Sequence, residues 1–190
     1  MTRVETAHVP SGWSRIARRI RVPLGFCFAV IYLWLAHPLP VTIFLGCLIV
    51  TAGLGVRAIA SGQLRKNEEL ATSGPYSYTR NPLYLGSIVI AIGFAVAARN
   101  LWIWVLLFSL FVFIYVPVIA SEEAFLRSKF PDFDAYASAV PRLLPCWSGQ
   151  SLTENFSREL YLKHREYNAL IGAALMMLAV AVKMLEVTNS

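Results

Sequence analysis

Five long apolar runs divide the chain, and polar segments separate them. The runs cover residues 22–37, 41–60, 83–98, 101–120 and 167–185. A helix needs about 20 predominantly apolar residues to cross a bilayer, and each run approaches that length. The pattern therefore predicts an all-α, polytopic membrane protein with five transmembrane helices.

Short signals within and between the runs predict how these helices are joined and packed. Pro38 and Pro40 force a reversal after the first run, and residues 98–100 make the third and fourth spans an antiparallel hairpin. Pro117 predicts a kink in the fourth span. The second run carries small residues that let helix backbones approach closely, namely Gly46, Ala52, Gly53, Gly55 and Ala58.

Arg57 is the charged residue of the second run and lies near its end. A charge there would cost about 2.5 to 3.5 kcal/mol at the bilayer centre. We expect the side chain to reach the headgroups by snorkelling, with an acidic partner as the alternative.

Most lysines and arginines lie in three polar segments, residues 1–21, 61–82 and 121–166. With five spans these segments share one face, and the excess of positive charge predicts that this face, with the N-terminus, is cytoplasmic. We expect a bacterial inner membrane. We expect a single integral domain. It would comprise an interfacial arm (residues 1–21), the first two spans (22–60), a core with the third and fourth spans (61–146), and an amphipathic linker with the fifth span (147–190).

Composition supports the membrane class and narrows the partners. Hydrophobic residues make up 57% of the chain and charged residues 15%, and the mean hydropathy is +0.57. The net charge of +6 accompanies apolar runs, so lipid headgroups fit it better than nucleic acid. Three cysteines imply no disulfide framework, and three scattered histidines favour no metal site. The first 21 residues hold five arginines, so we expect no cleavable signal peptide.

The stretch from Gly74 to Gly86 is polar and rich in aromatic rings, between long apolar runs. It reads Gly-Pro-Tyr-Ser-Tyr-Thr-Arg-Asn-Pro-Leu-Tyr-Leu-Gly. Its prolines break any continuous helix, so we expect a fixed loop feeding a helix. Pro82 suits the first helical position and Asn81 the N-cap, where its side-chain oxygen would accept a backbone N–H. A plain cap is the simplest interpretation of Asn81, and a ligand role is the alternative.

A second set of polar side chains follows the fourth span: Glu122, Glu123, Tyr136 and Arg142. We expect it to face the first set, because both belong to cytoplasmic segments. Adjacent carboxylates at a membrane surface need partners, and Arg80 and Arg142 are the candidates. The glutamates could equally be a solvated helix end, and the tyrosines could be interfacial belt residues.

Taken together, the two sets resemble a known family. The stretch from Gly74 to Gly86 is similar to the Gly-x-Tyr-x-Tyr-x-Arg-His-Pro-x-Tyr-x-Gly signature of the isoprenylcysteine carboxyl methyltransferases, whose wider group includes phospholipid methyltransferases. Glu122-Glu123, then Phe130-Pro-Asp-Phe-Asp-Ala-Tyr136, then Val140-Pro-Arg-Leu-Leu-Pro145 resemble its second half. The resemblance extends from about Leu54 to Cys146.

The resemblance implies a membrane enzyme that uses S-adenosylmethionine, acts on a lipophilic small molecule or lipid, and lacks a Rossmann domain. It implies a catalytic set of Arg80, Glu123 and Arg142. It implies a cofactor pocket formed by Tyr76, Arg80, Asn81, Tyr84, Gly86, Glu122, Glu123, Tyr136 and Pro145. Asn81 replaces the family's usual histidine, so a step that needs an imidazole base cannot be carried over. This favours a carboxylate acceptor, which is already ionised near neutral pH.

Two other functions stay open at this point. A sterol-reductase-type membrane enzyme would use a nicotinamide cofactor, but the five-span size argues against it. A non-catalytic membrane protein could keep the fold without the cofactor, and Asn81 is the feature that favours this. The oligomeric state is not predicted.

Overall fold

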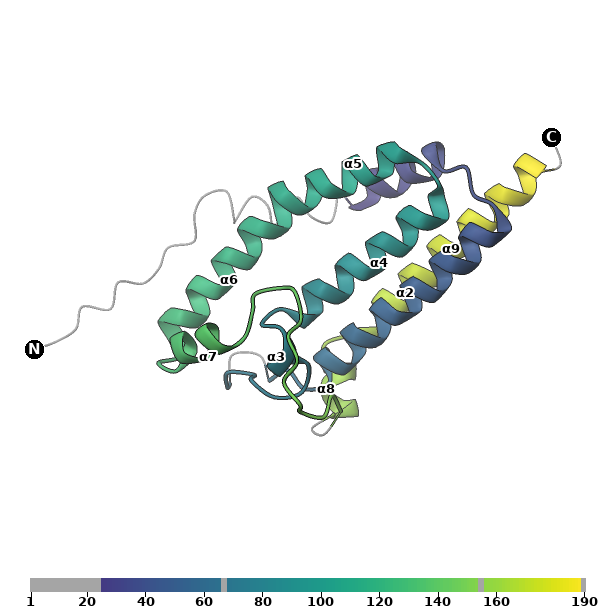
Figure 1. Ribbon diagram of the computed structural model, residues 1–190. Coiled ribbons are helices and arrows are strands. Elements are labelled where there is room, and N and C mark those ends of the chain that lie inside the picture. Colours follow the sequence, from purple (N-terminus) through teal and green to yellow (C-terminus); the bar gives the residue numbers. More distant parts are fainter. Residues whose placement is uncertain (1–24, 66–67, 154–155, 189–190) are drawn as a thin grey trace, which may run out of the picture.

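The computed structural model describes residues 25–65, 68–153 and 156–188, and every regular element in these ranges is a helix (Figure 1). In chain order the helices are Gly25–Leu35, α2 (Pro40–Ser61), α3 (Pro75–Tyr78), α4 (Pro82–Ala98), α5 (Leu101–Leu110), the π-helical η1 (Phe111–Tyr115), α6 (Val116–Lys129), α7 (Phe133–Ala139), α8 (Arg158–Lys163) and α9 (Tyr167–Thr188). The predicted all-α fold is confirmed. The expected N-terminal arm lies outside the described residues.

Three of the described helices are long and apolar enough to span a membrane: Pro40–Ser61, Leu101–Lys129 and Tyr167–Glu186. Two shorter apolar helices, Gly25–Leu35 and Pro82–Ala98, fall within the first and third predicted runs. Each predicted run therefore contains a helix, and the chain is an integral membrane protein. Three of these helices have the length of a full crossing, so the prediction of five spans stays a prediction.

The fourth apolar run continues as helix beyond the point where a polar segment was expected. The segment is polar from residue 121, and the structure shows that its first nine residues are helical, because α6 extends to Lys129. Its last turns are rich in good helix formers such as Glu122, Ala124 and Leu126. Because a helix satisfies its own backbone hydrogen bonds, it can extend from the apolar run into a polar region without a break.

Pro117 is accompanied by a local change of helix type. The preceding turn, η1, is π-helical, and the N–H of Val116 donates to the carbonyl of Phe111. Proline has no N–H to complete the regular α-helical ladder, and π turns are one way in which a helix accommodates such an interruption. The structure therefore has a wide turn just before the proline, and the kink at Pro117 stays a prediction.

Helices α2 and α4 pack along their lengths through paired glycines. A Cβ atom at Gly46 would lie 2.7 Å from the carbonyl oxygen of Gly93, and one at Gly53 would lie 2.8 Å from that of Gly86. These separations leave no room for a side chain, so the helix backbones are in direct contact. The predicted close approach is confirmed at Gly46 and Gly53, whereas a Cβ at Gly55 would meet nothing within 4 Å.

Arg57 holds α9 against α2. Its Nη2 lies 2.8 Å from Oε1 of Glu166, the residue before α9, and its Nε donates to Oε2 at 3.0 Å. The expectation of snorkelling is wrong, and the acidic partner is the observed solution. A bidentate pair satisfies both ions without either leaving the protein, which is why it replaces contact with the headgroups.

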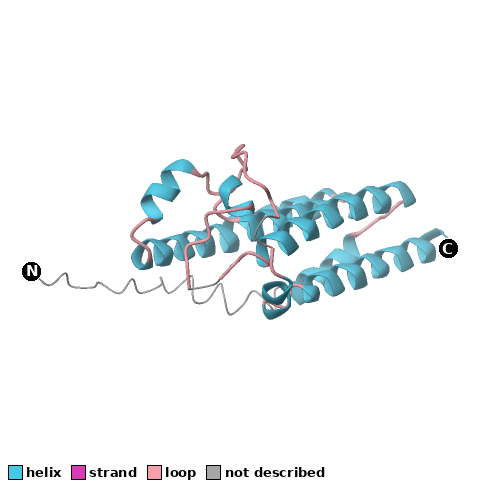
Figure 2. Ribbon diagram, turned by 90° about the horizontal axis from the view of Figure 1, so that it is seen from below, coloured by secondary structure: helices cyan, strands magenta, loops and turns pink. Residues whose placement is uncertain are grey.

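The polar segments gather at one end of the bundle. Helices α3, α7 and α8 and the long loops lie where α2 ends and α4 begins (Figures 1 and 2). At the opposite end, the Asn100 side chain accepts from the N–H of Trp102 and donates to the carbonyl of Leu35, which fixes the tight turn between α4 and α5. The two predicted polar segments therefore do share one end of the molecule.

Candidate functional site

Glu123 is the centre of a buried ion-pair cluster. It lies on α6, and 4% of its surface is exposed. Its Oε2 accepts from Arg142, with Nε at 2.9 Å and Nη2 at 2.8 Å, and its Oε1 lies 3.5 Å from Nε of Arg80. Two arginines and one glutamate leave an excess of one positive charge. The predicted arginine partners are confirmed as neighbours of Glu123, and the cluster suits an anionic ligand group.

Asn81 occupies the N-cap position of α4, as predicted, but its side chain does not cap the helix. Its Nδ2 instead donates to Glu123 Oε1 at 3.2 Å and to the carbonyl of Arg142 at 2.9 Å. The expectation of a capping hydrogen bond is therefore wrong. The start of a helix offers backbone N–H donors that would need the side-chain oxygen, whereas Nδ2 here donates to an ionised carboxylate in a charge-assisted hydrogen bond. Asn81 thus belongs to the cluster.

Backbone contacts join the two halves of the motif. The N–H of Arg80 donates to the carbonyl of Pro141 at 2.9 Å, and that of Cys146 donates to the carbonyl of Tyr78 at 2.8 Å. Between them, the buried hydroxyl of Thr79 donates to the carbonyl of Leu143 at 3.1 Å. The segment after α7 is thereby fixed along the segment before α4. This explains how residues far apart in the sequence reach Glu123.

Tyr136 and Tyr76 close the other side of the cluster. The Tyr136 hydroxyl donates to the backbone carbonyl of Tyr76 at 2.7 Å. Burial raises the pKa of both hydroxyls above the ordinary tyrosine value. Both hydroxyls therefore stay protonated near neutral pH. Among the described residues, three buried side-chain atoms have no hydrogen-bond partner: the Tyr76 hydroxyl, Nε of Arg80 and Oε1 of Gln63. The first two belong to this region and are free to donate to a ligand.

Replacing Tyr136 by phenylalanine should lower the free energy of unfolding by about 1 kcal/mol, because the buried Tyr76 carbonyl loses its donor. Thermal unfolding in detergent measures this. Tyr167→Phe on the exposed face of α9 is the matched control and should leave the midpoint unchanged. Equal midpoints for both variants would contradict the contact.

Four further predicted site residues lie outside the ion-pair cluster: Tyr84, Gly86, Glu122 and Pro145. The Tyr84 ring packs edge-on against Tyr115 of η1, with ring centroids 5.8 Å apart. Gly86 lies in the crossing with α2, where a Cβ would come within 2.6 Å of Arg57 Cγ. Glu122 and Pro145 are exposed and form no part of the ion-pair cluster. A cofactor role for these four stays a prediction.

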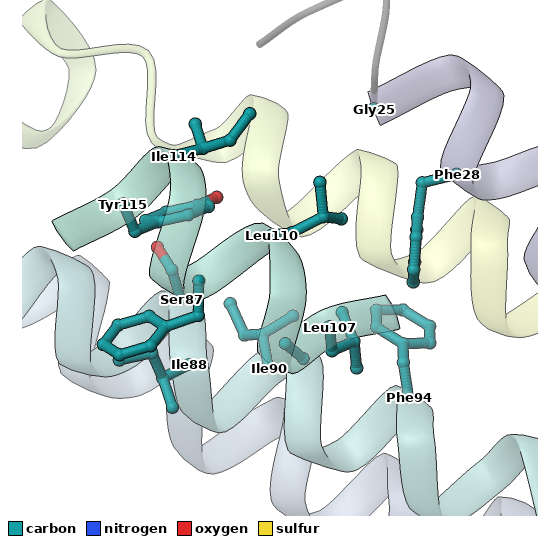
Figure 3. Close-up of a pocket in the computed structure, with 12 residues that line it drawn as sticks. Gly25, Phe28, Ser87, Ile88, Ile90, Phe94, Leu107, Leu110, Ile114 and Tyr115 are labelled. Carbon is teal, nitrogen blue, oxygen red and sulfur yellow. The ribbon is translucent and has the colours of Figure 1, made fainter. Parts of the chain in front are cut away.

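An apolar cavity of about 260 Å³ lies between α4 and the α5–η1 helix (Figure 3). It is lined by Gly25, Phe28, Ser87, Ile88, Ile90, Ala91, Phe94, Leu107, Leu110, Phe111, Ile114 and Tyr115. Ser87 and Tyr115 supply the polar side chains of this lining. Glu123 follows Tyr115 by eight residues along the same continuous helix, and Tyr84 packs on Tyr115. The polar cluster and the apolar cavity therefore follow one another along two helices, α4 and the continuous helix of α5, η1 and α6.

Sequence reasoning missed two members of this region. Glu166 lies at the end of a polar linker, and nothing in its local sequence marks it as the partner of Arg57. Ser87 is a polar residue inside an apolar run, one turn after Leu83, and that isolated position was the available signal. In the described part of the chain, no group of three or more His, Cys, Asp or Glu side chains is placed to hold a metal ion.

The fold and the site define an all-helical membrane protein with a buried arginine–glutamate cluster next to an apolar cavity. Residues 31–132 match the family described as phospholipid methyltransferase. This match covers more than half of the 190 residues. The chain belongs to this family of membrane methyltransferases.

The curated relatives include two proteins named for metal resistance and one named as a methyltransferase. The cobalt-zinc-cadmium resistance protein CzcN of Cupriavidus metallidurans is 38% identical over 107 residues, 52% of this chain and 50% of that protein. The nickel-cobalt-cadmium resistance protein NccN of Alcaligenes xylosoxydans is 35% identical over 113 residues, 59% and 52% of the two chains. The protein-S-isoprenylcysteine O-methyltransferase of Schizosaccharomyces pombe is 34% identical over 99 residues, 51% and 42%.

The chain thus matches about half the length of these relatives. No solved structure matches it.

Proposed function

We propose that this protein is an S-adenosylmethionine-dependent methyltransferase that acts on a lipophilic acceptor at the membrane surface. The observation that carries the proposal is the placement of the Glu123 cluster beside the apolar cavity. A methyl donor that is charged and water-soluble needs a polar site, whereas a lipid or prenyl chain needs an apolar one. Helix α4 and the continuous helix of α5, η1 and α6 carry both a polar and an apolar site.

The residues of the polar cluster fit such a cofactor. S-adenosylmethionine supplies an electrophilic methyl group on a sulfonium when bound. The Nε of Arg80, which is ion-paired with Glu123 but forms no hydrogen bond, and the hydroxyl of Tyr76 are buried donors for its carboxylate or other acceptor atoms. Asn81, Tyr84, Glu123 and Tyr136 complete the proposed pocket, and Gly86 lets Arg57 lie behind it.

The acceptor in this proposal is a carboxylate on a lipophilic molecule, as in an isoprenylcysteine, with a lipid headgroup as the alternative. Arg142 keeps 54% of its side chain exposed while it pairs with Glu123, so it retains surface for a second anion. A carboxylate is ionised near neutral pH and needs no base, which suits a site with Asn81 in place of histidine. The protein's contribution is then to orient the acceptor and exclude water.

The polar end of the bundle faces the cytoplasm in this proposal, and all five apolar helices belong to one domain. The excess of lysine and arginine at that end is the argument for the orientation. Labelled cofactor does not cross a bilayer, so inside-out vesicles should use it and right-side-out vesicles should not. The reverse result would contradict the orientation.

Calorimetry on the detergent-purified protein tests the function itself. We expect micromolar binding of S-adenosylhomocysteine and no binding of NADPH. Incubation of membrane extracts with methyl-labelled cofactor, followed by mass spectrometry, should then show label on a lipophilic molecule. NADPH binding would support a reductase instead, and binding of neither ligand would support a non-catalytic membrane protein.

Replacing Asn81 by aspartate should weaken S-adenosylhomocysteine binding at least tenfold, or about 1.4 kcal/mol. The new carboxylate would lie where Nδ2 now donates to Glu123 Oε1 at 3.2 Å, and two like charges would repel each other. Asn81→His is the matched control, because an imidazole N–H can still donate to Glu123. Calorimetry on both variants measures the difference. Equal affinities would place Asn81 outside the pocket.

A further inference from the structure

Arg57 connects α9 to the helix that carries the site. One edge of its guanidinium binds Glu166 through both carboxylate oxygens. Its Nη1 points to α4, where it donates to the Ser87 hydroxyl at 2.5 Å and to the Leu83 carbonyl at 3.3 Å. The pair is largely buried, with 22% of the Arg57 side chain and 12% of the Glu166 side chain exposed. A planar guanidinium can form such a fork, whereas a lysine ammonium cannot.

The contacts of Arg57 on α4 lie between the Glu123 cluster and the apolar cavity. Leu83 is in the first turn of α4, two residues after Asn81, and Ser87 lines the apolar cavity. The stem of Arg57 lies over Gly86, where a Cβ would come within 2.6 Å of its Cγ. Arg57 therefore contacts α4 at Leu83, Gly86 and Ser87, which lie on one face of this helix because they are three and four residues apart.

The electrostatics of Tyr76 show that the pair is also close to the polar cluster. Burial and the neighbouring Tyr136 are the main causes of the raised pKa of the Tyr76 hydroxyl. The charges of Glu166 and Glu122 raise this pKa further, and that of Arg57 lowers it. The pair and the unpartnered hydroxyl thus lie within electrostatic reach of one another.

We propose that Arg57 and Glu166 are positioning residues for the methyltransferase site. Glu166 orients the guanidinium, and the guanidinium fixes the first two turns of α4, so that Asn81 reaches Glu123 and Ser87 faces the cavity. This inference rests on the proposed function. It makes α9, which lies outside the family match at residues 31–132, a part of the functional unit.

The test compares two anchors of the same helix. Glu166→Gln removes the charge that orients Arg57, and Arg57→Lys keeps the charge but loses the fork. Both should bind S-adenosylhomocysteine about tenfold more weakly in calorimetry at a temperature where every variant is folded. Lys183→Met is the matched control. Lys183 anchors the far end of α9 by donating to the carbonyls of Leu33 and Trp34, so its loss should lower the unfolding midpoint and leave the affinity unchanged.

Each outcome decides the inference. Unchanged affinity in both Glu166→Gln and Arg57→Lys, with a wild-type protein that binds, overturns the positioning role alone. An equal loss in Lys183→Met assigns the effect to general packing of α9 and overturns it as well. A wild-type protein that binds no S-adenosylhomocysteine refutes the proposed function, and the positioning role falls with it. If Glu166→Gln fails to fold, the charge-conserving Arg57→Lys decides.

Discussion

Glutamine in place of Glu123 is expected to lower the free energy of unfolding by about 3 kcal/mol, the lower end of the cost of breaking a buried ion pair. The glutamate is 4% exposed and lies next to Arg80, Asn81 and Arg142. Its neutral replacement would leave the largely buried Arg80 without a counter-charge, whereas the half-exposed Arg142 can turn to water. S-adenosylhomocysteine binding should weaken at least tenfold, since the pocket loses its central partner. Thermal unfolding and calorimetry measure the two effects.

The neighbouring Glu122→Gln is the control for stability. It removes the same charge one residue away, but its side chain is exposed and outside the ion-pair cluster. Such surface changes are usually within about 0.5 kcal/mol. A similar loss of stability for both variants would mean that the carboxylates are interchangeable and that the cluster around Glu123 does not form. The affinity of Glu122→Gln also tests its predicted place in the pocket.

Alanine in place of Gly53 is the second large effect, with an expected loss of about 2 kcal/mol from overpacking. The added Cβ would lie 2.8 Å from the Gly86 carbonyl oxygen and 2.8 Å from the backbone nitrogen of Ile90. Backbone atoms cannot rotate away, so α4 must move from α2. That movement should also shift Asn81 and weaken cofactor binding. Thermal unfolding followed by calorimetry measures the two effects.

Gly55→Ala on the same helix is the matched control. A Cβ there meets nothing within 4 Å, so the substitution should stabilise α2 by about 0.5 to 1 kcal/mol through helix propensity. The two variants share the same chemical change and differ only in the face of α2 that carries it. Changes of the same sign would contradict the direct backbone contact of α2 with α4.

Much of the fold could be predicted because apolar runs and turn residues are local signals. The hairpin at residues 98–100 and the helix start at Pro82 are observed where they were predicted. Hydropathy marked the end of the fourth apolar run but not the end of its helix, because helix propensity carries the backbone on to Lys129. The family motif identified the two segments that meet at Glu123.

The sequence by itself determined the membrane class, the order of the helices, the family and the pairing of two distant polar segments. Only the tertiary structure decided which of two adjacent glutamates is buried. Successive residues on a helix point about 100° apart, and the rotation of α6 against its neighbours is set by packing. The same reason explains why Asn81 turns to Glu123 rather than to its own helix, and why Arg57 found its acidic partner across the fold in Glu166. These partners are distant in the chain, so no local pattern could name them.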